Sequence, residues 1–412
     1  MPPLRLFTAL VLAMLAAETA QARQGSLTPD EAVELAQANN PDLQMLVAEV
    51  DAAKARLAGA SLLFQANPSL TVTAGPRSSA AGDSRDSSIE LSQPVEISGQ
   101  RGARIEAAEA LVDVAEARLR ARRGEIAAAI LEAFGRALAA EQRARLAAEG
   151  LAVAQEGLAA AQERFEAGAA ALLEVNRARV EVGRMARDRS EAERRGAEAL
   201  AGLHLLLGLD SAEVPTLEGE LGVEERGVLD EARLIEQALA SRADIAAAGR
   251  ALDAASAQAR LAARARIPTP KVGVSYTREE ESDAEIVQGL LSFDIPLFNR
   301  NQEAQGVAAA RVSQLETEVA ATGRRVRQEV STAVARLRAA RSAADGFASD
   351  VVKAMQENME LGTESYRAGK IDFLQLLLIR RQTLEARNEQ INVLEELTAA
   401  RAQLDRATGG YQ

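Results

Sequence analysis

The sequence predicts a mainly α-helical fold with a small β part, built from two copies of one unit. Hydrophobic residues make up 47% of the 412 residues but aromatic residues only 3%. Burial must therefore come from many close contacts between small side chains, as in long packed helices. The repeat appears at an offset of 202 residues, which pairs Asp42 with Asp244, Pro68 with Pro270, Pro94 with Pro296 and Gln100 with Gln302. Further along, the offset is 201 and pairs Gly168 with Gly369, so we expect both halves to fold alike.

The composition argues against several kinds of site. The chain has no Cys and a single His, His204, which excludes disulfides, thiol catalysis and Cys or His metal clusters. Its 48 Lys+Arg and 60 Asp+Glu give a net charge of −12, whereas phosphate binding needs a basic surface. No nucleophile–base pair or phosphate-binding loop is visible. We therefore expect no enzyme activity, no cofactor, no metal site and no nucleic-acid partner.

The first residues have the pattern of a secretory signal peptide, predicted over 1–22. Arg5 precedes an apolar run from Leu6 to Ala17, and the small residues of Ala20-Gln21-Ala22 mark a cleavage site after Ala22. The run of about a dozen apolar residues is too short to span a bilayer, which takes about 20. Because there is no Cys, no lipidation site is expected. We predict an exported protein without a lipid anchor.

The first repeat is expected over 23–209 and the second over 229–412, with a linker at 210–228. In the first repeat, Thr28-Pro29-Asp30-Glu31 is a capping box with Pro at the first helical position. The short helix that begins there should end at Asn40-Pro41, and a second helix is expected over 42–66.

Two strands are predicted in each repeat. Apolar and polar residues alternate over about 68–76 and 88–97 in the first copy, and over about 270–278 and 286–297 in the second. Each stretch has about ten residues, the length of a transmembrane β-strand, with one apolar and one polar face.

A long helical hairpin is expected after each pair of strands, over 100–208 and 302–406. The first helix should run unbroken to Ala167, which at 1.5 Å per residue gives about 100 Å. Gly168 and Gly369 are the expected reversals. The returning helix and the helix at 42–66 together match the length of the long helix, so we predict that one continuous helix packs beside two stacked ones. The second repeat should do the same with 302–367.

The strands predict an oligomer. Four strands per chain cannot close a barrel, and sheet edges exposed to lipid would leave amide groups without partners. Two chains give 8 strands and no aqueous channel, whereas three give 12 and leave an open lumen. We expect a homotrimer with a 12-stranded β-barrel in the membrane and an α-helical barrel in the periplasm.

Several segments resemble those of TolC-family outer-membrane factors, and most closely the CzcC-like branch that serves heavy-metal efflux pumps of the RND class. The resemblance covers the whole mature chain. The segments that carry it are Leu91-Ser92-Gln93-Pro94-Val95-Glu96, Gly99-Gln100-Arg101, Pro296-Leu297-Phe298-Asn299-Arg300-Asn301-Gln302, Arg164-Phe165-Glu166-Ala167-Gly168 with Leu173-Glu174-Val175, and Tyr366-Arg367-Ala368-Gly369-Lys370 with Phe373-Leu374-Gln375. The resemblance implies a TolC-like trimeric duct in the outer membrane of a Gram-negative bacterium, with a long periplasmic portion. Its implied partners are outer-membrane lipid, a periplasmic adaptor (membrane fusion protein) and an inner-membrane RND pump.

The resemblance also implies two sites at the hairpin reversals, the tips. The adaptor should dock on Gly168, Ala169, Gly369 and Lys370. The periplasmic aperture should be lined by Glu174, Arg177, Tyr366, Arg367 and Gln375. The family commonly has an acidic residue where this chain has Gln375, so a ring of carboxylates at the aperture would depend on Glu174 alone.

Three functions remain possible from the sequence. The favoured one is a passive outer-membrane exit duct for heavy-metal cations. The second is the same duct serving drug efflux or type I protein secretion. The third is a periplasmic coiled-coil structural or adaptor protein, which ranks last because it requires no amphipathic strand hairpins.

Overall fold

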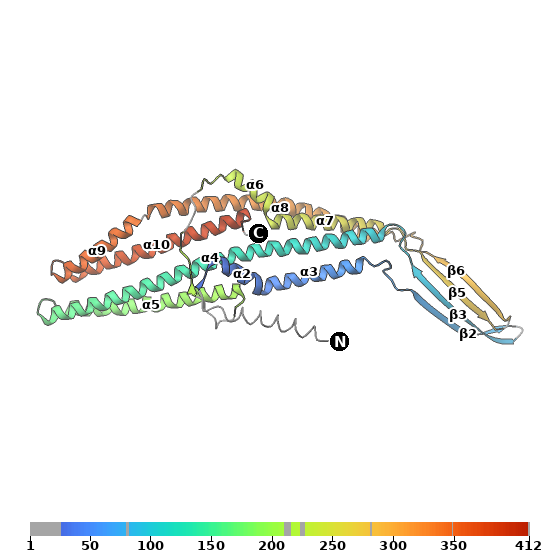
Figure 1. Cartoon of the computed structure of the whole chain (residues 1–412), viewed down its shortest axis with the longest axis horizontal. Helices are drawn as coiled ribbons and strands as arrows, with labels where there is room; N and C mark the ends of the chain where they lie inside the picture. The colour runs from blue at the N-terminus through green and yellow to red at the C-terminus, as the bar shows by residue number, and fades with distance from the viewer. Residues whose placement is uncertain are drawn as a thin grey trace, which may run out of the picture. The chain divides into compact units, whose positions relative to one another are not determined.

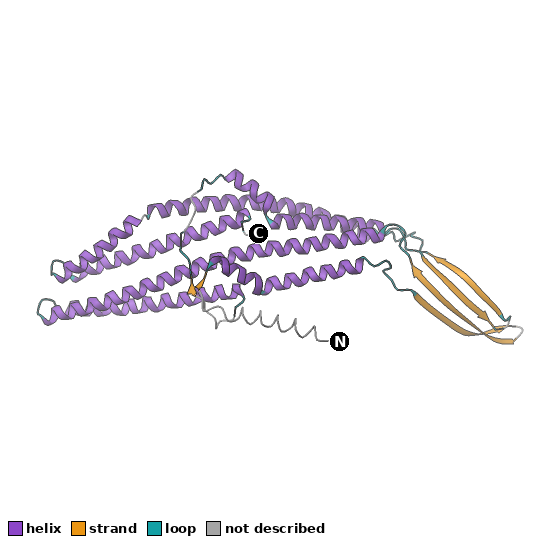
Figure 2. Cartoon of the chain, viewed as in Figure 1, coloured by secondary structure: helices purple, strands orange, loops and turns teal. Residues whose placement is uncertain are grey.

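The computed structural model describes residues 26–79, 82–209, 216–222, 227–280, 282–347 and 349–410. The predicted signal peptide and parts of the predicted linker lie outside these residues and stay predictions. The described chain is mainly helical with a small β part, as predicted (Figures 1 and 2). No helix in this described part is both long enough and apolar enough to cross a membrane.

The elements follow one another in the same order in the two halves, except that the second half has one more helix after its strands. The first half contains β1 (Ser26–Leu27), α2 (Pro29–Asn39), α3 (Pro41–Ala60), β2 (Ser69–Ser79), β3 (Gly82–Pro94), α4 (Gln100–Glu166) and α5 (Leu172–Leu207). The second contains β4 (Thr216–Leu217), α6 (Glu231–Ser241), α7 (Ala243–Arg264), β5 (Lys271–Glu279), β6 (Ala284–Ser292), α8 (Gln302–Gly346), α9 (Ser349–Arg367) and α10 (Phe373–Thr408).

The chain forms two compact units, and each takes segments from both halves. The tip unit consists of Met1–Gln44, Arg122–Ser241 and Val326–Gln412, and the sheet unit of Met45–Ala121 and Arg242–Arg325. The compact units therefore do not coincide with the two sequence repeats.

The start of α2 forms the predicted capping box. The Thr28 hydroxyl accepts a hydrogen bond from the Glu31 N–H, and the Glu31 carboxylate accepts one from the Thr28 N–H. These bonds satisfy N–H groups that have no partner within the helix. The helix ends at Asn39 and α3 begins at Pro41, as the Asn40-Pro41 pair predicts.

The helix predicted over 42–66 ends earlier, at Ala60. Arginines of α4 bind the carbonyl groups that the chain leaves free there: Arg104 Nε donates to Ala60 O at 3.1 Å, and Arg101 Nη2 to Ser61 O at 2.8 Å. The Ser61 hydroxyl donates to Leu57 O at 2.6 Å. Side-chain donors from a distant segment thus end this helix, and the local pattern does not reveal them.

The two long helices differ. α4 is continuous over 67 residues, close to the predicted 100–167. The prediction of a continuous helix over 302–367 is wrong, because α8 ends at Gly346 and α9 begins at Ser349. Gly is a poor helix former, so Gly346 favours the end of a helix here.

The core of the tip unit is rich in Ala, as the composition predicts. Ala139, Ala161 and Ala238 are fully buried. Larger side chains such as Phe134 and Leu337 are buried between them, and most of these are aliphatic and not aromatic. Small side chains let helix backbones approach closely, so many weak contacts replace the aromatic packing that the chain lacks.

The four long strands form an antiparallel sheet in the order β2-β3-β5-β6 (Figure 1). The register pairs Val72 with Ile89, Ile89 with Tyr276, and Tyr276 with Val287. β2 and β6 are the edge strands, so one edge of each has no strand partner in the described chain. An uncovered edge is a site for pairing with another strand.

The strand bounds differ from the predicted ones at the turn between β2 and β3, at the end of β3, which is Pro94 instead of 97, and at the end of β6. β2 continues to Ser79 and β3 begins at Gly82, whereas the predicted strands end at about 76 and begin at about 88. Arg77 bridges Asp86 at 2.6 Å and Glu279 at 3.0 Å across the sheet, which favours this longer pairing. β6 ends at Ser292 instead of 297. Pro296 cannot donate to a strand partner, and the Leu297 N–H donates to Ile295 O at 2.9 Å in a tight turn.

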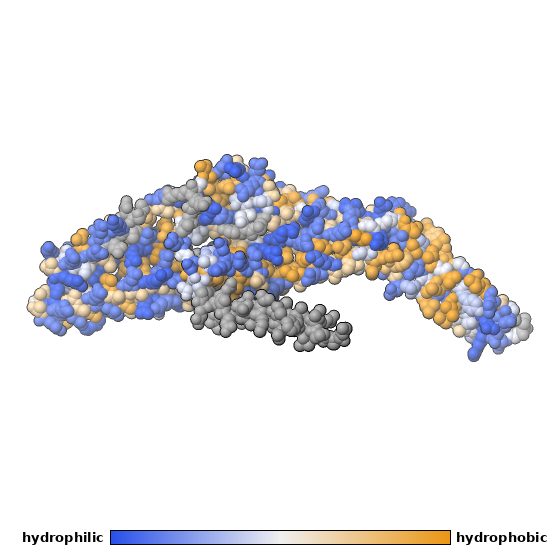
Figure 3. Space-filling view, viewed as in Figure 1, coloured by the Kyte–Doolittle hydropathy of each residue, from blue (hydrophilic) through white to orange (hydrophobic). Residues whose placement is uncertain are grey.

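One face of the sheet is apolar and exposed. The large apolar side chains on it are Leu70, Val72, Ile89, Leu91, Val272, Val274, Tyr276, Val287 and Leu291. Figure 3 shows hydrophobic surface over the strands and hydrophilic surface near the hairpin turns. An apolar band followed by polar ends is the pattern of strands that face lipid.

Candidate functional site at the hairpin tips

Both hairpins reverse through the same backbone motif. Gly168 and Gly369 each have φ of 71°, a left-handed conformation that Gly adopts without the strain of a side chain. A Cβ at either position would meet nothing within 4 Å, so the backbone angle and not space requires Gly. Each reversal has the paired hydrogen bonds of a Schellman motif. These are Gly168 N–H to Phe165 O (2.9 Å), Ala169 N–H to Arg164 O (2.8 Å), Gly369 N–H to Tyr366 O (3.0 Å) and Lys370 N–H to Ser365 O (2.8 Å).

The predicted docking residues lie on the surface of these turns. Gly168, Ala169, Gly369 and Lys370 are all exposed. Phe165 next to them is also exposed, at 42%. The two tips therefore expose their hydrogen-bonded turns and one aromatic ring to solvent.

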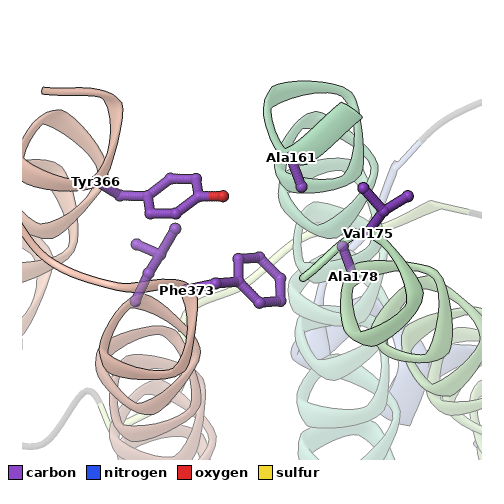
Figure 4. Packing of buried hydrophobic residues seen from close by; sticks show 6 residues of the cluster. Ala161, Val175, Ala178, Tyr366 and Phe373 are labelled. Atoms are coloured by element: carbon purple, nitrogen blue, oxygen red, sulfur yellow. The ribbon is translucent and has the colours of Figure 1, made fainter. Parts of the chain in front are cut away.

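Below the turns, the two hairpins share a small apolar core. Its buried members are Ala161, Val175, Ala178, Tyr366, Phe373 and Leu376. Figure 4 shows the rings of Tyr366 and Phe373 directed from the second hairpin toward the alanines and valine of the first. The two ring centroids are 5.7 Å apart with the planes at 57°, a favourable tilted arrangement.

Arg164 of the first hairpin binds the second. Its Nη1 donates to the Tyr366 carbonyl oxygen at 2.8 Å, and its guanidinium lies 4.6 Å from the centre of the Tyr366 ring. The same side chain thus makes a charge-assisted hydrogen bond and a cation–π contact. Arg164 belongs to the segments that carry the family resemblance, but it was not among the predicted site residues. Its position just before the reversal indicates a tip residue, but the sequence does not show that its side chain contacts the other hairpin.

The structure brings two of the predicted aperture residues together. The Tyr366 hydroxyl donates to Glu174 Oε2 at 3.3 Å, a long hydrogen bond between the hairpins. Burial raises the pKa of Tyr366, and the negative charge of Glu174 raises this pKa further. The hydroxyl therefore keeps its proton and acts as a donor at neutral pH.

The other aperture residues do not join this contact. Arg177, Arg367 and Gln375 are exposed, and within the described chain neither arginine forms an ion pair with Glu174. Gln375 instead completes a capping box at the start of α10. Its side-chain oxygen accepts from the Asp372 N–H at 3.1 Å, while Asp372 accepts from the Gln375 N–H at 2.7 Å. Asp372-Phe373-Leu374-Gln375 carries this capping signal in the sequence, although we did not predict it.

A buried arginine lies between the hairpins, farther from the turns. Arg380 is 8% exposed, and its Nη1 donates to Val153 O at 3.0 Å. Its guanidinium occupies the space beside Gly157, where a Cβ would collide with Nη1. Burial lowers the pKa of Arg380, although Glu156 and Glu181 act to raise it. Its Nε has no hydrogen-bond partner among the described residues.

A cavity of about 60 Å³ adjoins this arginine and is lined by Glu181, Met185 and Met359 among others. This volume can hold a water molecule. The described residues contain no group of three or more His, Cys, Asp or Glu side chains placed to hold a metal ion. The site is a packed contact between two hairpins.

Comparison with known proteins places this architecture in one family. The model for the family "Outer membrane efflux protein" matches the chain twice, over residues 32–209 and 234–410. The cobalt-zinc-cadmium resistance protein CzcC of Cupriavidus metallidurans is 27% identical over 386 residues, which cover 93% of this chain and 90% of CzcC.

Solved structures show the same fold. The structure of CusC, described as a transmembrane channel, has a TM-score of 0.75 and 20% sequence identity, and the match covers 92% of this chain and 91% of CusC. The outer membrane channel CmeC of Campylobacter jejuni has a TM-score of 0.75 and 17% identity, covering 93% and 85% of the two chains. These matches confirm the predicted TolC-like fold. Because its family model matches both halves, this chain belongs to the outer membrane efflux protein family.

Proposed function

We propose that the chain is the outer-membrane exit duct of a tripartite RND-type efflux system, that it works as a homotrimer, and that its cargo is heavy-metal cations. The observation that supports the trimer is the sheet. It has an exposed apolar face and two edge strands, β2 and β6, whose outer edges have no strand partner in the described chain. In lipid those edges must pair with other copies, and three copies give a 12-stranded barrel around a lumen.

The tips are the proposed contact with the rest of the machine. Gly168, Ala169, Gly369 and Lys370 are exposed on two turns of identical backbone geometry. Each chain has two such turns, so a trimer has six. A periplasmic adaptor that recognises the backbone shape of the turn could bind at each of them. The adaptor in turn links the duct to an inner-membrane RND pump.

The aperture is proposed to close just inside the tips. Three-fold symmetry brings three copies of Glu174 to one axis, where their charges repel one another. The Tyr366 hydroxyl hydrogen-bonds to Glu174 within each chain at 3.3 Å and orients the carboxylate. Ion pairs of Glu174 with Arg177 or Arg367 of a neighbouring copy would complete the closed state.

The support for metal cations comes from the similarity to CzcC, the cobalt-zinc-cadmium resistance protein of Cupriavidus metallidurans. Its match extends over nearly the whole of both chains. The net charge of −12 is compatible with cationic cargo, because a negative surface repels anions and raises the local cation concentration.

The cargo is tested by growth of a deletion strain of the source bacterium on Zn, Co, Cd, Ni, Cu and Ag salts, with a panel of organic drugs alongside. We expect sensitivity to one or more of the metals and recovery when the intact gene is returned on a plasmid. Sensitivity to drugs alone would show that the duct serves drug efflux. Unchanged growth on all metals would contradict the metal cargo.

The trimer is tested separately by cross-linking of detergent-solubilised outer membranes. We expect a ladder that ends at three subunits. A monodisperse soluble monomer recovered from the periplasm would contradict the duct itself.

A further inference from the structure

The polar face of the sheet carries a single carboxylate in its three middle rows. The strand register fixes these rows. They are Ser69-Ser92-Gly273-Leu290, then Thr71-Glu90-Ser275-Gln288, then Thr73-Ser88-Thr277-Ile286. The Ser69 and Ser92 hydroxyls are 2.8 Å apart and those of Thr73 and Ser88 2.5 Å apart, which shows that these side chains share one face. Glu90 thus lies among hydroxyl and amide groups, opposite the apolar face.

Charges nearer the hairpin turns are already paired on this same face. Arg77 bridges Asp86 and Glu279. Glu90 is four residues from Asp86 along β3, about 13 Å at the strand rise. It makes no hydrogen bond or ion pair with any described residue. The nearest basic side chain of its face is Lys271, four residues from Ser275 on β5 and therefore also about 13 Å away.

We propose that Glu90 is the cation-selecting residue of the duct, an inference that rests on the proposed function. The apolar face must contact lipid, so the opposite face lines the lumen and three-fold symmetry sets three Glu90 carboxylates at one height. A low-dielectric wall around a water-filled pore focuses the field of these unpaired charges. The ring attracts divalent cations more strongly than monovalent ones and repels anions.

The side chains around Glu90 are suited to a cation that passes through the duct and not to one that stays bound. Thr71, Ser275 and Gln288 offer oxygen atoms that can replace a few waters of a passing cation. One carboxylate per chain, without imidazole or thiolate, holds a metal only weakly, and conduction requires binding that is easily reversed. The ring can therefore select cations by charge and still let them pass through the duct.

The chain has no Cys, so one introduced thiol can report the local potential. Ser88→Cys places a thiol on the same strand and face, two residues or about 7 Å from Glu90. Cationic and anionic methanethiosulfonates, added outside intact cells, should both reach it through the outer mouth of the barrel. We expect the ratio of cationic to anionic modification rates to fall about threefold in Glu90→Gln, from the screened Coulomb interaction at this distance. Both reagents attack the same thiolate, so a change in the pKa of the thiol cancels in the ratio.

Matched variants separate the possible outcomes. Glu90→Asp keeps the charge and should keep the ratio, and Glu90→Thr is a second neutral variant in case Glu90→Gln does not assemble. Ile89→Cys on the apolar face should stay unmodified. If Ser88→Cys reacts with neither reagent in an assembled trimer, this face does not line a lumen and the proposed duct fails. If it reacts but the ratio is unchanged in the neutral variants, the duct stands and the role of Glu90 is refuted.

Discussion

Gly157 and Arg380 provide a test of how the two hairpins are held together. In Gly157→Ala, the new methyl group would occupy the position of the Arg380 guanidinium and displace its Nη1. The hydrogen bond from Nη1 to Val153 O would be lost. A hydrogen bond to a charged group contributes about 1.5–3 kcal/mol to the free energy of unfolding. Ala is favoured over Gly inside a helix by about 0.5–1 kcal/mol. The net effect should be a loss of about 1–2 kcal/mol in the free energy of unfolding.

A double-mutant cycle makes the prediction specific. Arg380→Met removes the guanidinium and the buried charge but keeps a flexible apolar side chain. In that background there is nothing to displace, so Gly157→Ala should now stabilise the protein by about 0.5–1 kcal/mol. The same substitution is thus expected to change sign with the residue at position 380.

The assay is denaturant unfolding of the purified protein, followed by the circular dichroism of its helices. Gly183→Ala on α5 is the matched control, because a Cβ there meets nothing within 4 Å. It should stabilise both backgrounds by a similar amount. If Gly157→Ala has the same effect with Arg380 present and absent, the guanidinium does not depend on the space at Gly157 and the reasoning is refuted.

Three further predictions concern the tips and the fold. Glu174→Ala should raise single-channel conductance in planar bilayers and sensitise cells to vancomycin, and an unchanged conductance in an assembled trimer would place the gate elsewhere. Gly168→Pro or Gly369→Pro should abolish efflux at an unchanged trimer level, because Pro cannot adopt the positive φ of these turns; normal efflux would reduce the tips to simple reversals. Burial acts to raise the pKa of Asp244, but the hydrogen bond and charge of Arg242 outweigh it and leave this pKa lowered. The stability from the pair is therefore present above the unfolded-state pKa of about 4 and is lost as pH falls through the folded-state value. Asp244→Asn should flatten the dependence of Tm on pH below about 4, and an unaltered curve would show that the pair does not contribute.

Much of the fold could be predicted because its signals are local. The capping box at Thr28, the alternation in the strands and the glycine reversals each depend on neighbours a few residues away. The errors have non-local causes. α3 ends early because Arg104 of another helix binds its last carbonyl groups, and β2 runs on because Arg77 finds its partners across the sheet. Such partners are fixed only once the chain has folded.

The site was predicted less completely, because the two repeats have similar sequences at the tips and do not show which copy supplies the buried residues and which the exposed ones. Arg179 and Arg380 occupy matching positions, yet Arg179 is exposed and Arg380 is buried. Phe165 and Tyr366 also match, but Phe165 is 42% exposed and Tyr366 only 1%. Equal sequence positions therefore do not mean equal environments.

This inequality bears on how the tips work. The second hairpin supplies the aromatic rings of the shared core, and the first supplies the partners that hold them, Arg164 above the Tyr366 ring and Glu174 at its hydroxyl. Arg164 corresponds to Ser365 in the other copy, which has no charge to place over a ring, and Glu174 corresponds to Gln375, for which Phe165 offers no hydroxyl. The hairpins therefore pack as complementary halves and not as interchangeable ones. Tyr366 is buried in this internal contact, so of the two matching rings only Phe165 is exposed to a partner protein. Loss of the first tip should therefore weaken adaptor docking more than loss of the second.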